Sequence, residues 1–247
     1  MDLRNIGWMP IDVPKFDKKE ELIADFHDDF KDTGYVLDQL NRVNTNPGIG
    51  FGGAHDMQIQ RVVARSASLE TKFYTEDDLR FQEKELTPTQ RDLLEYCKKY
   101  IPIFDPEIRL HKIGPKGMAM HLDFLKYIPG TKTQKNPEFY DHIVANEPCG
   151  FRMKVRGTLT GELKAMRGNE EEGYDWDNPI VARMPTDTDW FVLNSTSLMH
   201  GTPDRVADNI DTNDRYILVM IGWPDVEKLD ELLTRSAEKY KNLVLTL

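Results

Sequence analysis

The sequence predicts a mainly β protein with flanking helices, built as one domain spanning residues 1–247. Many short runs of alternating apolar and polar residues, separated by Gly and Pro, fill the middle of the chain. Helical apolar patterns flank them at residues 16–33 and 225–241. We therefore expect a jelly-roll barrel over about residues 105–225, supported by helices and loops of residues 1–104 and by the C-terminal helix 225–241.

Composition limits the classes of function. The net charge of −10 disfavours binding to nucleic acid or to an anionic membrane, because both require a basic surface. No apolar stretch approaches the roughly 20 residues of a membrane span. Two cysteines, Cys97 and Cys149, are too few for a disulfide framework. We expect a cytoplasmic protein that acts on a small molecule or a peptide.

Two helices are predicted in the N-terminal hundred residues. Asp17 and Glu20 form a capping-box pattern at the start of residues 16–33. Thr87 followed by Pro88 and Gln90 has the cap, first-turn proline and box residue that begin a second helix.

Strands are predicted from alternation and from apolar runs bounded by turn residues. A hairpin over residues 109–123 is expected around Gly114–Gly117, because Gly and Pro favour a turn between its two extended runs. The other expected strands are residues 58–64, 151–163, 190–199 and 215–223. The Gly- and Pro-bounded segments Gly48–Gly53 and Ile128–Gly150 are expected to be loops that border a site.

A metal site is predicted from three residues. His121 and Asp123 are two positions apart on an expected strand, so their side chains point to the same side. His200 lies at the end of another apolar run. Two histidines and one carboxylate form the facial triad that holds Fe(II) in non-haem oxygenases and leaves coordination positions open for substrates.

Cations on two neighbouring expected strands predict a carboxylate site beside that metal. Arg215 opens the strand after the loop that follows His200, and its guanidinium can bind a carboxylate through two parallel hydrogen bonds. Arg152 and Lys154 share one face of the alternating strand 151–163, which suits an acid bound inside a barrel.

The ordered pattern of His-x-Asp, a distant His and then an Arg resembles the Fe(II)/2-oxoglutarate-dependent oxygenases. Residues 105–225 resemble the aspartyl/asparaginyl β-hydroxylase group and its cis-proline hydroxylase relatives. Arg152-Met-Lys-Val stands where that group has Arg-Met-His-Leu, so Lys154 departs from the family histidine. The family's late strand has an Arg, apolar residues and an Asp-Trp-His-Pro end, and here Arg215-Tyr-Ile-Leu-Val-Met-Ile-Gly-Trp-Pro stands in its place.

This resemblance implies a double-stranded β-helix, a cupin-like barrel that binds Fe(II), 2-oxoglutarate and O2. His121, Asp123 and His200 would hold the metal, while Arg215, Arg152 and Lys154 would hold the co-substrate. The implied reaction converts 2-oxoglutarate to succinate and hydroxylates an unactivated C–H of an amino acid, a peptidyl side chain or a small metabolite.

Two other classes fit the same residues. A cupin-like barrel can bind a small acid without turnover, and a zinc hydrolase can use the same His, His and Asp ligands. A hydrolase would keep its activity without oxygen and would have no need of Arg215.

Overall fold

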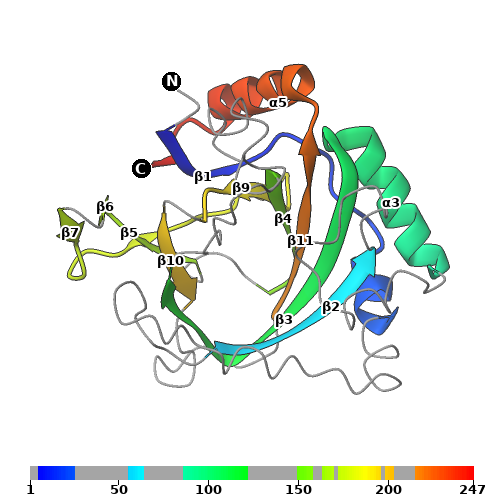
Figure 1. Cartoon of the computed structure of the whole chain (residues 1–247), viewed down its shortest axis with the longest axis horizontal. Helices are drawn as coiled ribbons and strands as arrows, with labels where there is room; N and C mark the ends of the chain where they lie inside the picture. The colour runs from blue at the N-terminus through cyan, green and yellow to red at the C-terminus, as the bar shows by residue number, and fades with distance from the viewer. Residues whose placement is uncertain are drawn as a thin grey trace, which may run out of the picture.

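The computed structural model of the chain describes residues 5–25, 55–63, 86–121, 149–157, 163–169, 172–195, 198–202 and 215–247. Antiparallel strands are the main regular structure of these residues, and the helices lie at the periphery (Figure 1). The prediction of a mainly β protein with flanking helices is therefore confirmed. The main sheet contains β1 (Ile6–Pro10), β2 (His55–Val63), β3 (Ile103–His121), β4 (Cys149–Arg156), β5 (Lys164–Met166), β8 (Ile180–Val181), β9 (Trp190–Leu193), β10 (Met199–Thr202), β11 (Arg215–Pro224) and β12 (Leu245–Thr246). A separate small ribbon pairs β6 (Gly168–Asn169) with β7 (Gly173–Tyr174).

The long strand β3 connects two groups of strands. The strand order is β12-β1-β9-β4-β11-β3-β10-β5-β8, and β2 pairs with β3 beside this path. The first part of β3 pairs with β11, up to Ile113 opposite Arg215. Its last part pairs with β10, from Met118 opposite Thr202 to His121 opposite His200. Figure 1 shows β3 curving between these two pairings. The first group is therefore β12-β1-β9-β4-β11-β3, and the second is β3-β10-β5-β8.

The predicted hairpin over residues 109–123 is wrong. The structure has a single strand from Ile103 to His121, the end of the described part of this region, and the Gly/Pro segment 114–117 forms a bulge within it. In the pairing with β2, Met118 lies opposite His55 and Ile113 lies opposite Met57. The β3 segment between Ile113 and Met118 is therefore longer than the β2 segment opposite it, which is a bulge. Gly117 has a φ of 70°, a left-handed conformation that glycine adopts readily. The chain does not reverse here because β2 pairs with both flanks of the bulge, while β11 pairs with the first flank and β10 with the second.

The two faces of the first group contact different apolar clusters. On one face, which we call the helix-side face, alternate residues of β3, β4, β9 and β11 pack against the helices. The members from these strands are Ile103, Ile108, Leu110, Phe151, Met153, Val155, Trp190, Val192, Tyr216, Leu218 and Met220. On the other face, which we call the inner face, Ile113, Phe191, Leu193, Ile217 and Val219 pack with Leu163, Ala165, Ala182 and Leu198 of the second group and its connections. The second group therefore covers the inner face.

The helices cover the opposite face. α3 (Pro88–Tyr100) begins with the predicted capping box, in which Thr87 and Gln90 bond each other's backbone N–H groups. It contributes Leu93 and Cys97 to the helix-side cluster. α5 (Val226–Lys239) contributes Leu229, Leu232, Leu233 and Ala237 to the same cluster.

Two further expectations differ from the structure in extent. Residues 19–25 of the first expected helix are helical, residues 16–18 are not, and residues 26–33 lie outside the described residues. The expected strand 190–199 is two strands, because β9 ends at Leu193 and β10 begins at Met199. β9 pairs with β1 and β4, whereas β10 pairs with β3 and β5, so the chain changes from the first group to the second between them.

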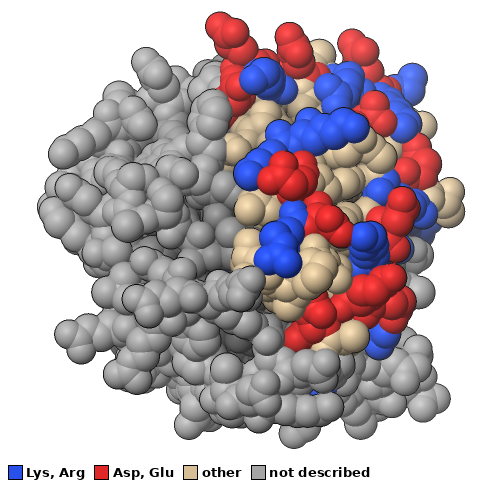
Figure 2. Space-filling view, turned by 90° about the vertical axis from the view of Figure 1, so that its right-hand side faces the viewer, with Lys and Arg blue, Asp and Glu red and all other residues tan. Residues whose placement is uncertain are grey.

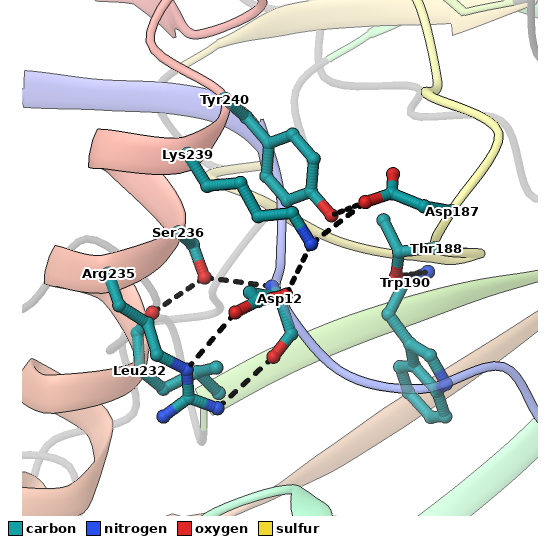
Figure 3. A network of polar contacts seen from close by, with 9 residues as sticks. All are labelled: Asp12, Asp187, Thr188, Trp190, Leu232, Arg235, Ser236, Lys239 and Tyr240. Atoms are coloured by element: carbon teal, nitrogen blue, oxygen red, sulfur yellow. Dashed lines mark hydrogen bonds and ion pairs between the residues drawn. The ribbon is translucent and has the colours of Figure 1, made fainter.

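Polar contacts attach α5 to the N-terminal segment (Figure 3). Ser236 accepts a hydrogen bond from the Asp12 backbone and donates one to the carbonyl of Leu232. Lys239 contacts the carboxylates of Asp12 and Asp187 at 2.6 and 2.8 Å. These contacts hold the helix that closes one side of the apolar cluster.

Charges of both signs are interspersed on the described part of the face in Figure 2. This face has no separate acidic or basic region among its described residues, although the chain as a whole is acidic. Neither α3, α5 nor any other described helical stretch has the length and apolar character that a bilayer crossing requires.

Candidate active site

His121 and His200 are neighbours across two strands. They are direct partners in the antiparallel pairing of β3 with β10, so their side chains lie on the same side of the strands. Their ring centroids are 4.5 Å apart. His200 is also the partner of Ala165, a member of the apolar cluster between the two groups. Both imidazoles therefore point toward the space that the inner face borders.

A backbone carbonyl fixes the tautomer of His200. The ring is 3% exposed, and its Nδ1 lies 2.9 Å from the carbonyl oxygen of Leu198. Since a carbonyl can only accept, Nδ1 must carry the proton. In the neutral ring, the lone pair is then on Nε2. Metal-binding histidines are commonly oriented in this way, by donating the hydrogen of the other ring nitrogen to a carbonyl or carboxylate.

The remaining predicted ligand, Asp123, lies outside the described residues, as do Gly48–Gly53 and nearly all of Ile128–Gly150. Within the described ranges, no group of three His, Cys, Asp or Glu side chains is placed to hold a metal ion. The described part of the chain thus supplies two of the three predicted ligands. Two imidazoles on adjacent strands suit a divalent transition metal, and one carboxylate would complete a facial triad.

Arg215 lies on the inner face at the first residue of β11. It is 1% exposed, and the next alternate residues, Ile217 and Val219, belong to the inner apolar cluster. Its side chain passes directly over Gly157, where a Cβ would lie 2.8 Å from Cγ of Arg215. Gly157 also has a φ of 97°, which side chains other than glycine rarely adopt. The positive φ and the close contact with Arg215 therefore both favour glycine at this position.

Arg152 and Lys154 also lie on the inner face, because Phe151, Met153 and Val155 between and beside them face the helices. Lys154 contacts Asp189, whose carboxylate also accepts a 2.5 Å ion pair from Lys19. Nη1 of Arg152 donates to the carbonyl of Leu193 at 3.3 Å. Asp189 is 1% exposed, so two lysines balance a carboxylate that burial would otherwise strongly disfavour.

Four residues of this region were not predicted as functional. Arg109 and His111 alternate with Ile108 and Leu110 of the helix-side cluster, which places them on the inner face. The alternation of Arg109, His111 and Ile113 was a signal for this placement. The contacts of Gly157 with Arg215 and of Asp189 with Lys154 join residues far apart in the sequence, and local patterns carry no signal for them.

No known protein-family model matches the chain, and no curated protein matches it in sequence. Similar solved structures include a Pseudomonas putida prolyl-4-hydroxylase, with 12% identity, 90% of this chain and 95% of that chain covered, and a TM-score of 0.36. A full-length Neurospora crassa protein in complex with alpha-KG, which is 2-oxoglutarate, has 10% identity, coverage of 90% of this chain and 77% of that chain, and a TM-score of 0.43.

A third similar structure is SnoN, a non-heme alpha-ketoglutarate-dependent epimerase from nogalamycin biosynthesis. It has 12% identity, coverage of 90% of this chain and 80% of that chain, and a TM-score of 0.38. Because the identities are 10–12% and the TM-scores are below 0.5, the functional assignment rests on the residues of this chain.

Proposed function

We propose that the protein is an Fe(II)- and 2-oxoglutarate-dependent dioxygenase that hydroxylates an unactivated C–H bond. The observation that carries this proposal is the histidine pair. His121 and His200 are cross-strand partners with ring centroids 4.5 Å apart, and the Leu198 carbonyl leaves Nε2 of His200 with the ring's lone pair. Asp123, two residues beyond His121 in the sequence, is the proposed third ligand.

The strand order supports a double-stranded β-helix, a jelly-roll barrel in a single domain. In such a barrel, two antiparallel sheets face each other and strands pass from one sheet to the other. Here β3 passes from the sheet with β11, β4 and β9 to the sheet with β10, β5 and β8. His121 and His200 lie on strands of the second group, and Arg215 lies on a strand of the first.

Fe(II) bound by one face of ligands would supply open coordination positions for 2-oxoglutarate and O2, and with them the oxidation of the substrate. The protein has two further tasks. It must bind the distal carboxylate of 2-oxoglutarate, and it must exclude water from the reacting atoms.

Arg215 suits the first task, because a guanidinium can form two parallel hydrogen bonds to one carboxylate. Arg215 is 1% exposed, so that contact would be shielded from water. Charge-assisted hydrogen bonds are stronger in such a buried site than in water. Arg152 and Lys154 on the neighbouring β4 contribute further positive charge to the same face. The apolar residues around them, Ile113, Ile217 and Val219, serve the second task.

The substrate class we propose is an amino acid, a peptidyl side chain or a small metabolite. The test is the formation of succinate from 2-oxoglutarate by the metal-loaded protein. We expect succinate with Fe(II) and O2, and none with Zn(II) or without O2. Hydrolytic activity that persists with Zn(II) and without oxygen would instead identify a zinc hydrolase. Metal and 2-oxoglutarate binding without succinate, across a broad substrate panel, would identify a binding protein.

A further inference from the structure

A small surface ribbon extends from the strands beside His200. β6 and β7 lie between β5 and β8 in the sequence, and Figure 1 shows them at the left edge of the molecule, beyond β10. In the pairing of β5 with β10, Ala165 lies opposite His200. In the pairing of β5 with β8, Ile180 lies opposite Ala165. The ribbon therefore leaves the second group of strands close to a proposed metal-binding histidine.

Trp176 follows β7 and is exposed. It is 42% exposed, whereas Trp8 and Trp190 are fully buried in the apolar clusters. Tyr174 of β7 lies edge-on to Trp176, with ring centroids 6.1 Å apart. Exposed tryptophan and tyrosine side chains that are held in place are frequent anchors for binding partners, because they supply a large contact area at a small cost in conformational entropy.

Hydrogen bonds fix the backbone on both sides of Trp176. The N–H of Asp175 donates to the carbonyl of Arg167 across the ribbon at 2.9 Å. The carboxylate of Asp175 accepts hydrogen bonds from the backbone and the side-chain amide of Asn178, at 3.2 and 3.1 Å. The turn that carries the indole is therefore closed by its own polar groups, and Trp176 remains at the surface.

Two carboxylates flank this exposed indole. Asp175 and Asp177 are exposed, and neither forms an ion pair with a Lys or Arg of the described ranges. The segment 167–180 contains five acidic residues and one basic residue. Carboxylates alone would be ordinary solvated charges, but a cation is also attracted to the face of an indole ring. Together, the ring and the carboxylates favour a Lys or Arg side chain.

We propose that Tyr174, Asp175, Trp176 and Asp177, which we call the ribbon surface, bind a basic side chain of a peptide or protein substrate. This inference rests on the proposed function, and it selects the peptidyl side chain among the proposed substrate classes. The negative charge of the ribbon surface disfavours nucleic acid and anionic membranes as its partner.

The position of the ribbon surface limits the spacing within such a substrate. Trp176 precedes Ile180 by four residues, which span at most about 14 Å. Ile180 and His200 are two strands apart, a separation of about 9–10 Å. Trp176 therefore lies within roughly 24 Å of His200, a distance that about seven extended residues cover. We expect the basic residue within about seven positions of the hydroxylated one.

Binding can be observed at Trp176 itself. The full chain, labelled with ¹⁵N in its tryptophan indoles, is titrated with a Gly/Ser peptide that contains several arginines and with the same peptide containing glutamines in their place. We expect the arginine peptide alone to shift the Trp176 resonance with saturation, while the Trp8 and Trp190 resonances stay unchanged. Equal shifts with both peptides, or no saturation, would overturn the proposal.

A second copy of the chain is the alternative occupant of the ribbon surface. It would shift the Trp176 resonance as the protein concentration rises without peptide, and it would increase the sedimentation coefficient. That result would overturn the proposal of a substrate site. We expect the Trp176 resonance of the peptide-free protein to be independent of protein concentration.

Variants separate the ribbon surface from general charge attraction, with binding measured by the fluorescence anisotropy of a labelled arginine peptide. Trp176→Ala should weaken binding roughly fivefold or more, and Trp176→Phe should retain part of it. Asp177→Asn should weaken binding by roughly two- to fivefold, less at high salt. Glu238→Gln, which removes an exposed carboxylate of α5, is the matched control and should leave binding unchanged. Equal weakening by Glu238→Gln would overturn the proposal.

Turnover distinguishes this inference from the proposed function. With a peptide that supports succinate formation, Trp176→Ala should raise the Michaelis constant for the peptide several-fold and leave kcat near normal. If succinate forms but the arginine peptide does not saturate Trp176, the ribbon surface is wrong and the dioxygenase proposal stands. If the arginine peptide saturates Trp176 but no succinate forms with Fe(II), O2 and 2-oxoglutarate, the dioxygenase proposal is wrong, and the ribbon surface stands as a binding site for basic peptides.

Discussion

The two faces of the β3-β11-β4-β9 sheet have the same strands and opposite chemistry. On the helix-side face, alternate residues such as Leu110, Met153 and Leu218 are buried and apolar. On the inner face, the residues between them include Arg109, Arg152, Lys154 and Arg215 among apolar neighbours. Burial of the apolar helix-side face stabilises the fold. The inner face can therefore carry charged side chains, whose burial alone would be unfavourable.

The largest effect, on iron content and turnover, is expected when a proposed metal-binding histidine is removed. His200→Ala should lose bound iron and all 2-oxoglutarate turnover, because the remaining ligands bind a metal far less well. Iron content and succinate formation measure this effect. His111→Ala, on β3 of the first group, is the control and should retain its iron. Normal iron content in His200→Ala would contradict the assignment of the metal site.

The next effect concerns the inner face alone. Arg215→Ala should raise the Michaelis constant for 2-oxoglutarate by about thirtyfold or more, since losing one buried charge pair costs about 2–5 kcal/mol. Iron content should stay near normal. Arg215→Lys should recover only part of the binding, because an ammonium group cannot form two parallel bonds. An unchanged Michaelis constant in Arg215→Ala would remove the proposed carboxylate site.

A residue of the same strand that points to the helices tests the other face. Leu218 is fully buried in the helix-side cluster, and Leu218→Ala should lower the free energy of unfolding by about 2–5 kcal/mol. Below its melting temperature, the variant should keep a normal Michaelis constant for 2-oxoglutarate. Chemical denaturation and succinate assays measure the two quantities. A changed Michaelis constant without a loss of stability would show that the two faces are not separate in function.

Gly157 tests how closely the backbone supports Arg215. A Cβ at this position would lie 2.8 Å from Cγ of Arg215, so Gly157→Ala should displace the guanidinium. We expect a several-fold rise in the Michaelis constant for 2-oxoglutarate with normal iron content. Gly173→Ala is the matched control, because Gly173 also has a positive φ of 85° but nothing within 4 Å of its added Cβ. A similar rise in both variants would assign the effect to backbone strain.

The smallest effect is expected at the polar contacts of α5. The hydrogen bond from Lys239 holds the pKa of Asp187 below its ordinary value, and the carboxylates of Asp12 and Asp187 raise the pKa of Lys239. Asp187 therefore contributes stability above the ordinary carboxyl pKa of 3.8, and this is lost as the pH falls through its lowered pKa. Lys239 contributes below 10.5, and this is lost as the pH rises through its raised pKa.

Lys239→Met should accordingly lower stability by at most about 1 kcal/mol, because its contacts are partly exposed to water. The difference from the wild-type protein should be constant between about pH 5 and 9 and shrink on either side. Thermal unfolding across this range measures it, with Lys241→Met as a control for removal of a nearby surface charge. A difference that grows at low pH would contradict the pairing with Asp187.

Local sequence signals predicted the elements that depend on local interactions. The capping box of Thr87 and Gln90 predicted the start of α3, the alternation around Met153 predicted β4, and the apolar run around Leu218 predicted β11. The hairpin at Gly114–Gly117 was wrong because a Gly/Pro pattern indicates a local break, whereas the choice between a turn and a bulge depends on distant partner strands.

In the candidate site too, local sequence patterns predicted some features and tertiary contacts determine the others. The spacing of alternate residues placed Arg152 and Lys154 on one face, and the order of motifs selected His121 and His200. The carbonyl contact of His200, the glycine beneath Arg215 and the ion pair of Lys154 with Asp189 arise from tertiary packing. These contacts determine tautomer, position and charge balance, and residue types alone do not specify them.

The most direct measurement of the central claim is the coupling between metal and co-substrate. Without oxygen, the affinity for 2-oxoglutarate is measured by calorimetry with and without Fe(II), in the wild-type protein and in His200→Ala. If both bind at one centre, Fe(II) should increase the affinity for 2-oxoglutarate strongly, and 2-oxoglutarate should increase the affinity for Fe(II) by the same factor. His200→Ala should abolish this coupling. Equal affinity for 2-oxoglutarate with and without Fe(II) would contradict the account.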